Sequence, residues 1–406
     1  LIVDNARKRV NTLSELPKES QMFYNDLEIS TENLNFARND TSQILLKAIH
    51  INLHIGELDK SYKLLKTIKT SDNIILSKYN YLLGNYNQEK KNLDECLINF
   101  NDSLDLYKTL KINDRIYEVH RSIGVTYIHK GDYSKAMEHL QKCMKYYTKN
   151  NNEQGLSLVT GNIGSIYFWQ GNLDEAYKYC KKQYKISAKI DSKQTIQLGL
   201  GTMANVFNIK GDYNKALEIF KKIIIIAEDI NDKSTMSYHY RNIGICYKNL
   251  KKYDKAMSLY TKQLKLAESM GNLFEIASAH DCIGLIHQKQ YNYNDSMIAF
   301  KNAYDFASKS KNLQVLSNIN GNMGILFTDM GKLDEALKHF KQSYEIFKQL
   351  KNVRGKALIN YELSKIYLLQ DEYQKSIENL NEGSEILKNI GDLPYYINSL
   401  LLLAKS

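Results

Sequence analysis

A self-similar pattern returns about every 40 residues along the chain, and it constrains the fold more than any other feature of the sequence. A small residue, usually glycine, occupies one position of each repeat, called here the register position: Gly84, Gly124, Gly164, Ala204, Gly244, Gly284, Gly324 and Ser364. A second small residue follows twelve positions later, and a bulky one follows sixteen positions later in most repeats, as Ala256 and Tyr260 follow Gly244. Such a unit cannot bury its apolar face alone, so the pattern predicts stacked units.

Each repeat is predicted to form two helices, A and B. The 406 residues contain two prolines, Pro17 and Pro394, so the chain between them lacks the strongest helix breaker. Turns such as Lys130-Gly131-Asp132 predict the end of helix A, because glycine suits a left-handed C-cap and Asp suits a turn. A second polar turn, such as Asn113-Asp114, closes the repeat. We expect helices of about 14 and about 17 residues, whose small residues let them approach closely.

These columns resemble those of the tetratricopeptide repeat (TPR) family, in which small, aromatic, Ala and Phe positions recur. The 40-residue spacing resembles the longer-helix subclass of kinesin light chains, spindle-polarity adaptors and bacterial sensor proteins. Two features depart from the family: no proline follows helix B, and the only tryptophan, Trp169, does not stand in the family's early Trp column. The resemblance implies an all-α, right-handed superhelical solenoid of stacked antiparallel helix pairs.

The pattern also predicts how the chain is divided. We expect an array of about nine repeats over residues 35–391, an N-terminal helical cap or degenerate repeat over residues 1–34, and a capping helix or a further repeat over residues 392–406. The chain begins with Leu1 rather than Met, which favours a piece of a longer protein.

Composition and motifs exclude several classes of function. No catalytic or metal-binding motif is present, so we expect neither an enzyme nor a cofactor. No apolar run is long enough to span a membrane. The five cysteines form no C-x-x-C pair, which favours a reducing compartment and a cytoplasmic protein. The net charge of +10 would weakly favour an acidic partner, but lysines on solvated helix faces are the preferred explanation, and nucleic acid is not the expected partner.

The resemblance implies that the A helices line a concave groove that binds the ligand. Asn162, Asn242 and Asn322 each stand two positions before the register position. An amide both donates and accepts hydrogen bonds, so this column suits the backbone of an extended peptide. The alternative is that each asparagine bonds a neighbouring helix of its own chain.

A second column lies three positions before the register position, and it contains Arg121 and Arg241. Arg241 and Lys248 could hold an acidic side chain or a terminal carboxylate, because guanidinium presents a planar fork of donors. The alternative is an ion pair within the chain. The remaining predicted groove residues are Trp169, Asn205 and Asn208.

Two functions follow from the resemblance. The first is a scaffold without catalytic activity that binds another protein or peptide, extended or helical and of acidic character, in the groove of the A helices. The alternative is a sensor or regulatory segment of a larger signalling protein, similar to peptide-pheromone receptors or joined to a kinase, cyclase, protease or DNA-binding effector.

Overall fold

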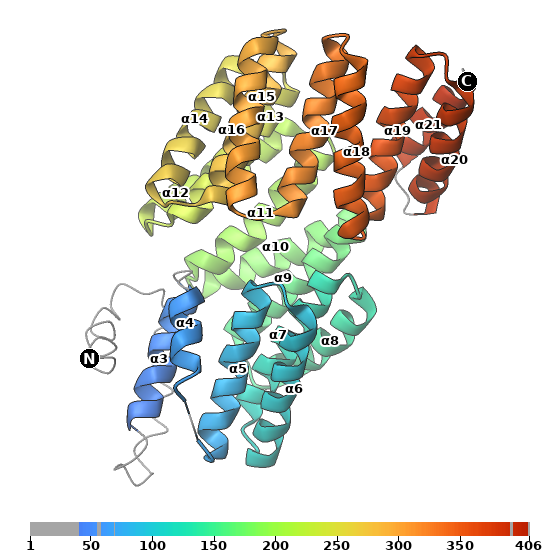
Figure 1. Cartoon of the computed structure of the whole chain (residues 1–406). Coiled ribbons are helices and arrows are strands. Elements are labelled where there is room, and N and C mark those ends of the chain that lie inside the picture. The colour runs from blue at the N-terminus through green and yellow to red at the C-terminus, as the bar shows by residue number, and fades with distance from the viewer. Residues whose placement is uncertain (1–39, 55–57, 69, 390–392, 405–406) are drawn as a thin grey trace. The chain divides into compact units, whose positions relative to one another are not determined.

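The computed structural model describes residues 40–54, 58–68, 70–389 and 393–404, and these residues form helices and turns without any strand (Figure 1). The predicted N-terminal cap over residues 1–34 lies outside the described residues. Contacts between helices divide the chain into two compact units, Leu1–Thr202 and Met203–Ser406, and the division falls inside α11 (Lys193–Ile209). No helix among the described residues is both long and apolar enough to cross a bilayer.

Odd-numbered helices are the A helices of the pairs, and even-numbered helices are the B helices. The first unit contains, before α11, these helices: α3 (Asp40–His54), α4 (Leu58–Leu65), α5 (Asn73–Glu89), α6 (Leu93–Leu110), α7 (Asn113–Lys130), α8 (Tyr133–Lys149), α9 (Glu153–Trp169) and α10 (Leu173–Lys189). Within this unit the largest contacts join A to B in one pair, such as α5 with α6 and α9 with α10.

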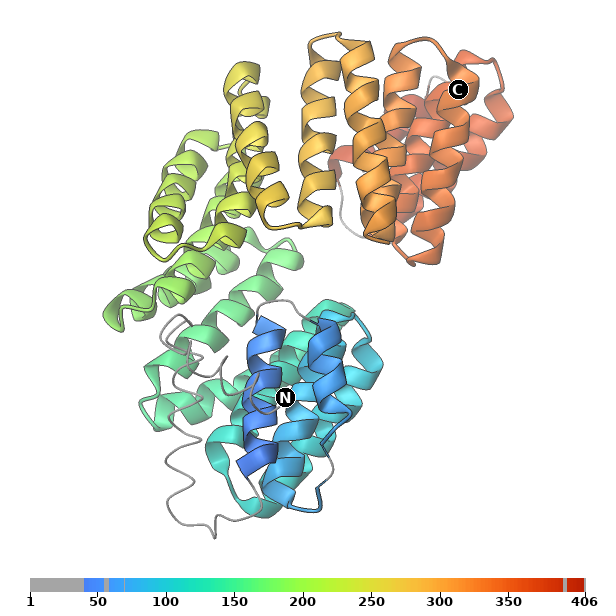
Figure 2. The ribbon, with the colours of Figure 1, turned by 60° about the vertical axis from the view of Figure 1, so that its left-hand side comes forward.

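The second unit continues the same pattern. After α11 it contains these helices: α12 (Tyr213–Asp229), α13 (Lys233–Asn249), α14 (Tyr253–Ser269), α15 (Leu273–Lys289), α16 (Tyr293–Lys309), α17 (Leu313–Asp329), α18 (Leu333–Gln349), α19 (Val353–Leu369), α20 (Tyr373–Asn389) and α21 (Leu393–Leu403). Figures 1 and 2 both show the helices from α15 to α20 standing side by side, and short turns make neighbouring helices antiparallel. The predicted all-α solenoid of stacked antiparallel helix pairs is confirmed.

The close approach of helices A and B depends on the register position. A Cβ atom at Gly244 would lie 2.3 Å from Cε1 of Tyr260, and one at Gly324 would lie 2.6 Å from Cε1 of Phe340. Both distances are far shorter than any real carbon–carbon contact, so in these two pairs only glycine allows the bulky ring of helix B to lie where it does on helix A. The register glycines therefore set the spacing in the pairs that contain them.

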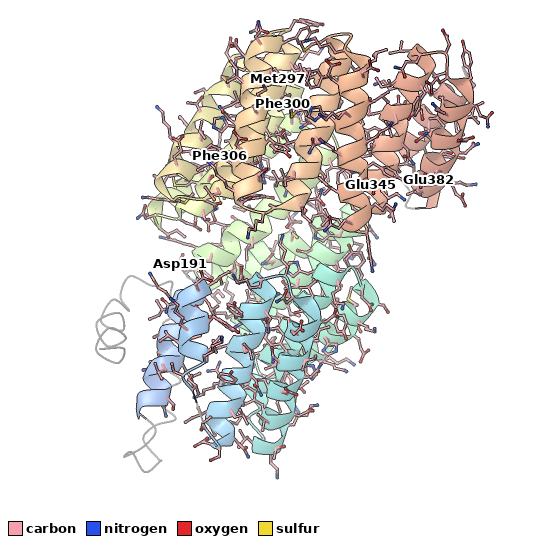
Figure 3. The ribbon with its side chains drawn as sticks, viewed as in Figure 1. Asp191, Met297, Phe300, Phe306, Glu345 and Glu382 are labelled. Carbon is pink, nitrogen blue, oxygen red and sulfur yellow. The ribbon has the colours of Figure 1, made fainter. Side chains whose placement is uncertain are left out.

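The bulky residue of helix B also reaches the next pair. Figure 3 labels Met297, Phe300 and Phe306 on α16, and Phe300 is fully buried. Its cluster contains Ala277 of α15 and Ile319 of α17, so three successive helices share one core. Each pair thus buries its apolar face against its neighbour, as expected for a repeat that cannot fold alone.

The turns follow from local backbone chemistry. Gly131, predicted to be a left-handed C-cap, has a φ of 77°, and Lys111 adopts the same conformation in another turn with a φ of 57°. Polar residues then begin the following helix: the Asp132 side chain accepts a hydrogen bond from the backbone N–H of Lys135, and Asn152 accepts one from Gly155. A helix end and a helix start are thereby completed within a very short connection.

Two details of the sequence-based expectation were wrong. Helix A is longer than expected and equals helix B in length: α9 and α10, for example, have 17 residues each. The residues Asn113-Asp114 lie inside α7 rather than in a turn. Both differences have the same physical reason. A connection consists of only a left-handed residue and an N-cap residue, such as Lys111 and Ile112, so the next helix begins earlier than expected.

The two kinds of helix-interior glycine predict opposite mutational effects. Gly244→Ala should lower the free energy of unfolding by about 1–3 kcal/mol, because the new methyl group overlaps the buried Tyr260 ring. Gly321→Ala should raise it by up to about 1 kcal/mol, because its Cβ would lie 3.4 Å from Ile359 Cδ1 and alanine favours the helix. Urea denaturation of both variants measures the two changes. Equal effects would contradict the packing role of the register position.

Candidate functional site

The A helices form the inner side of each stack. Successive A helices contact each other, α7 with α9 in the first unit, and α13 with α15 and α15 with α17 in the second. No contact of that extent joins successive B helices among the described α14, α16 and α18 of the second unit. A stack whose A helices lie closer together curves towards them, so the polar residues of the A helices are the candidate ligand contacts.

In the first unit, Arg121 of α7 lies in a group of aromatic and acidic side chains. The Tyr81 hydroxyl donates to Glu118 Oε1 at 3.3 Å, and Arg115 Nη1 donates to Glu118 Oε2 at 2.6 Å. Burial disfavours the charge on Arg121, but Tyr81, Tyr147 and Glu118 outweigh burial and raise the pKa of the guanidinium. Arg121 therefore remains a cation that faces carboxylate and phenol groups of its own chain.

The other predicted residues of the first unit lie on α9. Asn162 is partly exposed, and its buried Nδ2 atom has no hydrogen-bond partner. Trp169, at the C-terminal end of the helix, is 64% exposed, and its ring lies nearly perpendicular to that of Phe168. An exposed tryptophan on the same helix as an unpaired amide offers a stacking surface and a donor to a ligand.

In the second unit, a polar cluster joins α13, α15 and α17, defined by Arg241, Lys248, Asp281 and Asn322. Asn322 Nδ2 donates to Asp281 Oδ1 at 2.8 Å, which ties α17 to α15. Arg241 Nη1 donates to Ser278 Oγ at 2.9 Å, which ties α13 to α15. The polar cluster thus crosses three successive A helices.

Asp281 sits among these groups in an unusual electrostatic position. Burial raises the pKa of its carboxyl group to about 6, while the hydrogen bond from Asn322 and the charges of Lys248 and Arg241 oppose that rise. The carboxylate that faces Arg241 and Lys248 in this structure is therefore the chain's own. Asp281 stands in the same sequence column as Arg121 and Arg241, so the column could have identified it as a site residue.

The predicted asparagines divide into two kinds. Asn242 is 7% exposed and its Nδ2 atom has no partner, like that of Asn162. Asn322 instead bonds Asp281, as described above. Asn208 Oδ1 accepts a weak hydrogen bond from Cys246 Sγ at 3.5 Å, while Asn205 is partly exposed. The column of Asn162, Asn242 and Asn322 thus contains one amide that bonds its own chain and two amide donors without a partner.

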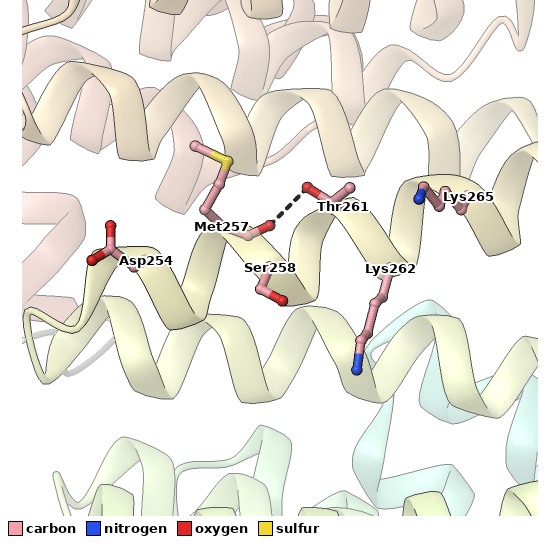
Figure 4. A pocket seen from close by; sticks show the side chains of 6 residues that line it. All are labelled: Asp254, Met257, Ser258, Thr261, Lys262 and Lys265. Atoms are coloured by element: carbon pink, nitrogen blue, oxygen red, sulfur yellow. Dashed lines mark hydrogen bonds between the residues drawn. The ribbon is translucent and has the colours of Figure 1, made fainter.

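A surface hollow that the sequence did not predict lies on a B helix rather than on the A helices. It has a volume of about 550 Å³, opens to solvent and follows one face of the B helix α14 (Figure 4). Its lining residues are Asp254, Met257, Ser258, Thr261, Lys262 and Lys265. Thr261 Oγ1 donates to the backbone oxygen of Met257 at 2.9 Å, so this hydroxyl is used within the helix.

No other kind of site stands out in the described part of the chain. No group of three or more His, Cys, Asp or Glu side chains is placed to hold a metal ion among the described residues. The five cysteines are free and buried, and burial raises the pKa of Cys143 and Cys282 to about 12. Thiols of that kind are poor nucleophiles at neutral pH.

Comparison with known proteins identifies the repeats. Two family models, each described as tetratricopeptide repeat, match residues 195–269 and 275–351, and residues 118–150 and 161–190. Together the matches cover slightly more than half of the chain. No curated protein matches it.

Solved structures share the fold. A Rap protein in complex with competence and sporulation factor is 12% identical, with a TM-score of 0.61, over 87% of this chain and 99% of that one. The apo form of the quorum sensor NprR from B. thuringiensis is 14% identical, with a TM-score of 0.60, over 86% and 100%. The Rap conjugation gene regulator of plasmid pLS20, bound to the Phr* peptide, is 14% identical, with a TM-score of 0.57, over 77% and 96%. At such low identity these likenesses show the fold alone.

The stability of the protein should fall as the pH drops from about 6.5 towards 4. Burial lowers the pKa of His120 and His239 to about 4, helped by His139 near the first and Arg241 near the second. The unfolded chain therefore binds more protons in this window, and the buried His239 alone contributes up to about 1.4 kcal/mol per pH unit. Asp281 acts in the opposite direction below pH 6, because its pKa is raised on folding.

Urea denaturation at pH 7, 6 and 5 measures this dependence. His239→Gln should flatten the slope, since the buried glutamine does not titrate. A slope that is the same in the parent chain and in this variant would show that other groups control the acid sensitivity.

Proposed function

The chain belongs to the tetratricopeptide repeat family, and on this premise we propose that it is a peptide- or protein-binding scaffold without catalytic activity. The proposed ligand contacts lie on the inner face of the A helices of each unit, at Asn162 in the first unit and at Asn242 in the second. The Rap regulator bound to the Phr* peptide supports a peptide ligand, because its chain has the same fold. The quorum sensor NprR supports a role in signalling for the same reason.

The observation that carries the proposal is the pair of unused amide donors at Asn162 and Asn242. An unpaired buried donor costs about 1–3 kcal/mol, so a protein rarely keeps two at equivalent repeat positions without a use. Neither Nδ2 atom has a hydrogen bond to give up when its side chain rotates towards a ligand. In each unit the backbone carbonyl of an extended peptide is an acceptor that fits the amide donor, because it recurs along the ligand whatever its sequence.

The charged residues of the inner face favour an acidic group on the ligand. Arg121, Arg241 and Lys248 are cations on A helices, and the whole chain carries a formal charge of +10. In the second unit Asp281 occupies the position that a ligand carboxylate would take near Arg241 and Lys248. A ligand carboxylate that displaced Asp281 would pair with Arg241 and Lys248. Asp281 would keep its hydrogen bond from Asn322.

The exposed Trp169 of α9 belongs to the proposed surface of the first unit, and Asn205 and Asn208 of α11 belong to that of the second unit. The five buried, reduced cysteines favour a cytoplasmic location. The second candidate function is a sensor segment of a larger signalling protein, in which the same surface would bind the ligand and pass the change to an effector domain. The likeness to the quorum sensor NprR favours this second function.

Selection of short peptides from a random display library, with the chain as bait, tests the proposal. A selected peptide should bind with a micromolar or lower Kd. The double change Asn162→Ala and Asn242→Ala should weaken that binding at least tenfold and should not lower the melting temperature, since the two amide donors make no internal bond and their burial is unfavourable.

Asn322→Ala is the matched control, because it lies in the same column and bonds Asp281. It should lower the free energy of unfolding by about 1 kcal/mol, the contribution of a partly exposed hydrogen bond to a carboxylate. If the double variant lost stability and kept its affinity, the asparagine column would be structural. Failure to select any peptide would also contradict the proposal.

A further inference from the structure

Neighbouring A helices meet through two positions of the repeat, and the same two positions meet in both units. One stands three positions before the register position, and the other stands two positions before it on the next A helix, 41 residues later. In the first unit Tyr81 of α5 shares a hydrogen bond of 3.2 Å with Ser122 of α7. In the second unit Asn322 of α17 donates to Asp281 of α15 at 2.8 Å. The two positions therefore form one contact that recurs along the stack.

Arg121 of α7 and Asn162 of α9 occupy these two positions in the next repeat of the first unit, and α7 contacts α9. Both residues are partly exposed, and neither side chain makes a hydrogen bond within the described part of the chain. The guanidinium and the buried Nδ2 atom of Asn162 are both donors, so they cannot bond each other. This contact thus brings together donors from two helices without an acceptor.

The charge around this pair is positive. Glu118 interacts electrostatically with Arg121, but its Oε2 atom already accepts from Arg115 Nη1 at 2.6 Å. The hydroxyl groups of Tyr81 and Tyr147 near Arg121 stay neutral at pH 7, because burial raises the pKa of both well above the usual range. The two arginines and Glu118 together therefore carry one positive charge.

The second unit shows which acceptor suits these positions. There the amide of Asn322 donates to the carboxylate of Asp281, and the charges of Lys248 and Arg241 favour the ionised form of that carboxylate. The repeat thus already surrounds one carboxylate with an amide donor and cations. In the first unit Arg121 stands where Asp281 stands in the second, so the amide and the cation are present without the carboxylate. A ligand carboxylate fits both, because its two oxygens accept several hydrogen bonds at once.

We propose that Arg121 and Asn162 form a carboxylate subsite, in which a carboxylate of the bound peptide accepts from the guanidinium of α7 and the amide of α9. This inference rests on the proposed peptide-binding function and names the chemical group that the first unit recognises. That group is the C-terminal carboxylate of the peptide or the side chain of its Asp or Glu. The second unit is the weaker site for it, because a ligand there has to displace Asp281.

Three pools of random, acetylated hexapeptides, mixed with the full chain and separated by ultrafiltration, test the proposal. The first pool has a free C-terminal carboxylate and no Asp or Glu. The second has a C-terminal amide and contains Asp and Glu, and the third has a C-terminal amide and neither acid. Mass spectrometry should find the first or the second pool retained at least tenfold more than the third. Either result supports the subsite, the first pool by a terminal carboxylate and the second by a side chain.

Variants locate the carboxylate. Arg121→Gln should lower the retention at least tenfold, because it removes the charge and the planar fork of donors. Asn162→Asp separates binding from folding: it should block retention without lowering the melting temperature, because the new carboxylate pairs with Arg121. Arg354→Gln serves as the control, since it removes the same charge from an exposed position on the A helix α19. It should retain peptides like the parent chain.

The remaining outcomes separate this inference from the proposed function. Equal retention of all three pools, or retention that survives Arg121→Gln, would overturn the subsite and leave peptide binding established. Retention that is lost with Arg241→Gln but kept with Arg121→Gln would also overturn it, because the carboxylate would then bind in the second unit. Retention of no pool would contradict the proposed function and the subsite together.

Discussion

The contact between a glycine backbone in helix A and a bulky side chain in helix B is the interaction on which the rest of the structure depends. The Phe100 ring lies against Gly84, and the Phe300 ring lies against Gly284, so closely that a methyl group would not fit. Phe300 thus packs against α15 of its own helix pair and against α17 of the next pair. The cluster around Phe300 contains residues of α15, α16 and α17. Spacing within a pair and stacking between pairs are therefore set by the same side chain.

The short turns keep the geometry of this contact the same from one helix pair to the next. A left-handed residue ends one helix, and an Asp or Asn N-cap begins the next, as Gly131 and Asp132 do between α7 and α8. Such short connections leave little freedom in the direction of the next helix. Glu382 of α20, labelled in Figure 3, adds a polar tie by accepting hydrogen bonds from Lys356 and Asn360 of α19 at 3.1 and 3.0 Å.

The polar residues of the A helices differ from repeat to repeat. The position three before the register position is Arg241 in α13, Asp281 in α15 and Gly321 in α17. Variation at one geometric position gives a charged, hydrogen-bonded surface rather than a uniform one.

The sequence by itself determined the helix pairs, their approximate boundaries and the glycine contact, because these depend on a spacing that recurs along the whole array. Only the tertiary structure decided which inner-face groups already have partners. Asn242 and Asn322 share one column, yet only Asn322 meets a carboxylate, since Asp281 stands on the neighbouring helix. Likewise the sequence showed leucines in α21, but their exposure depends on which face α19 and α20 cover. A periodic sequence specifies contacts within a repeat, whereas partners across repeats depend on the particular residues of the neighbouring repeat.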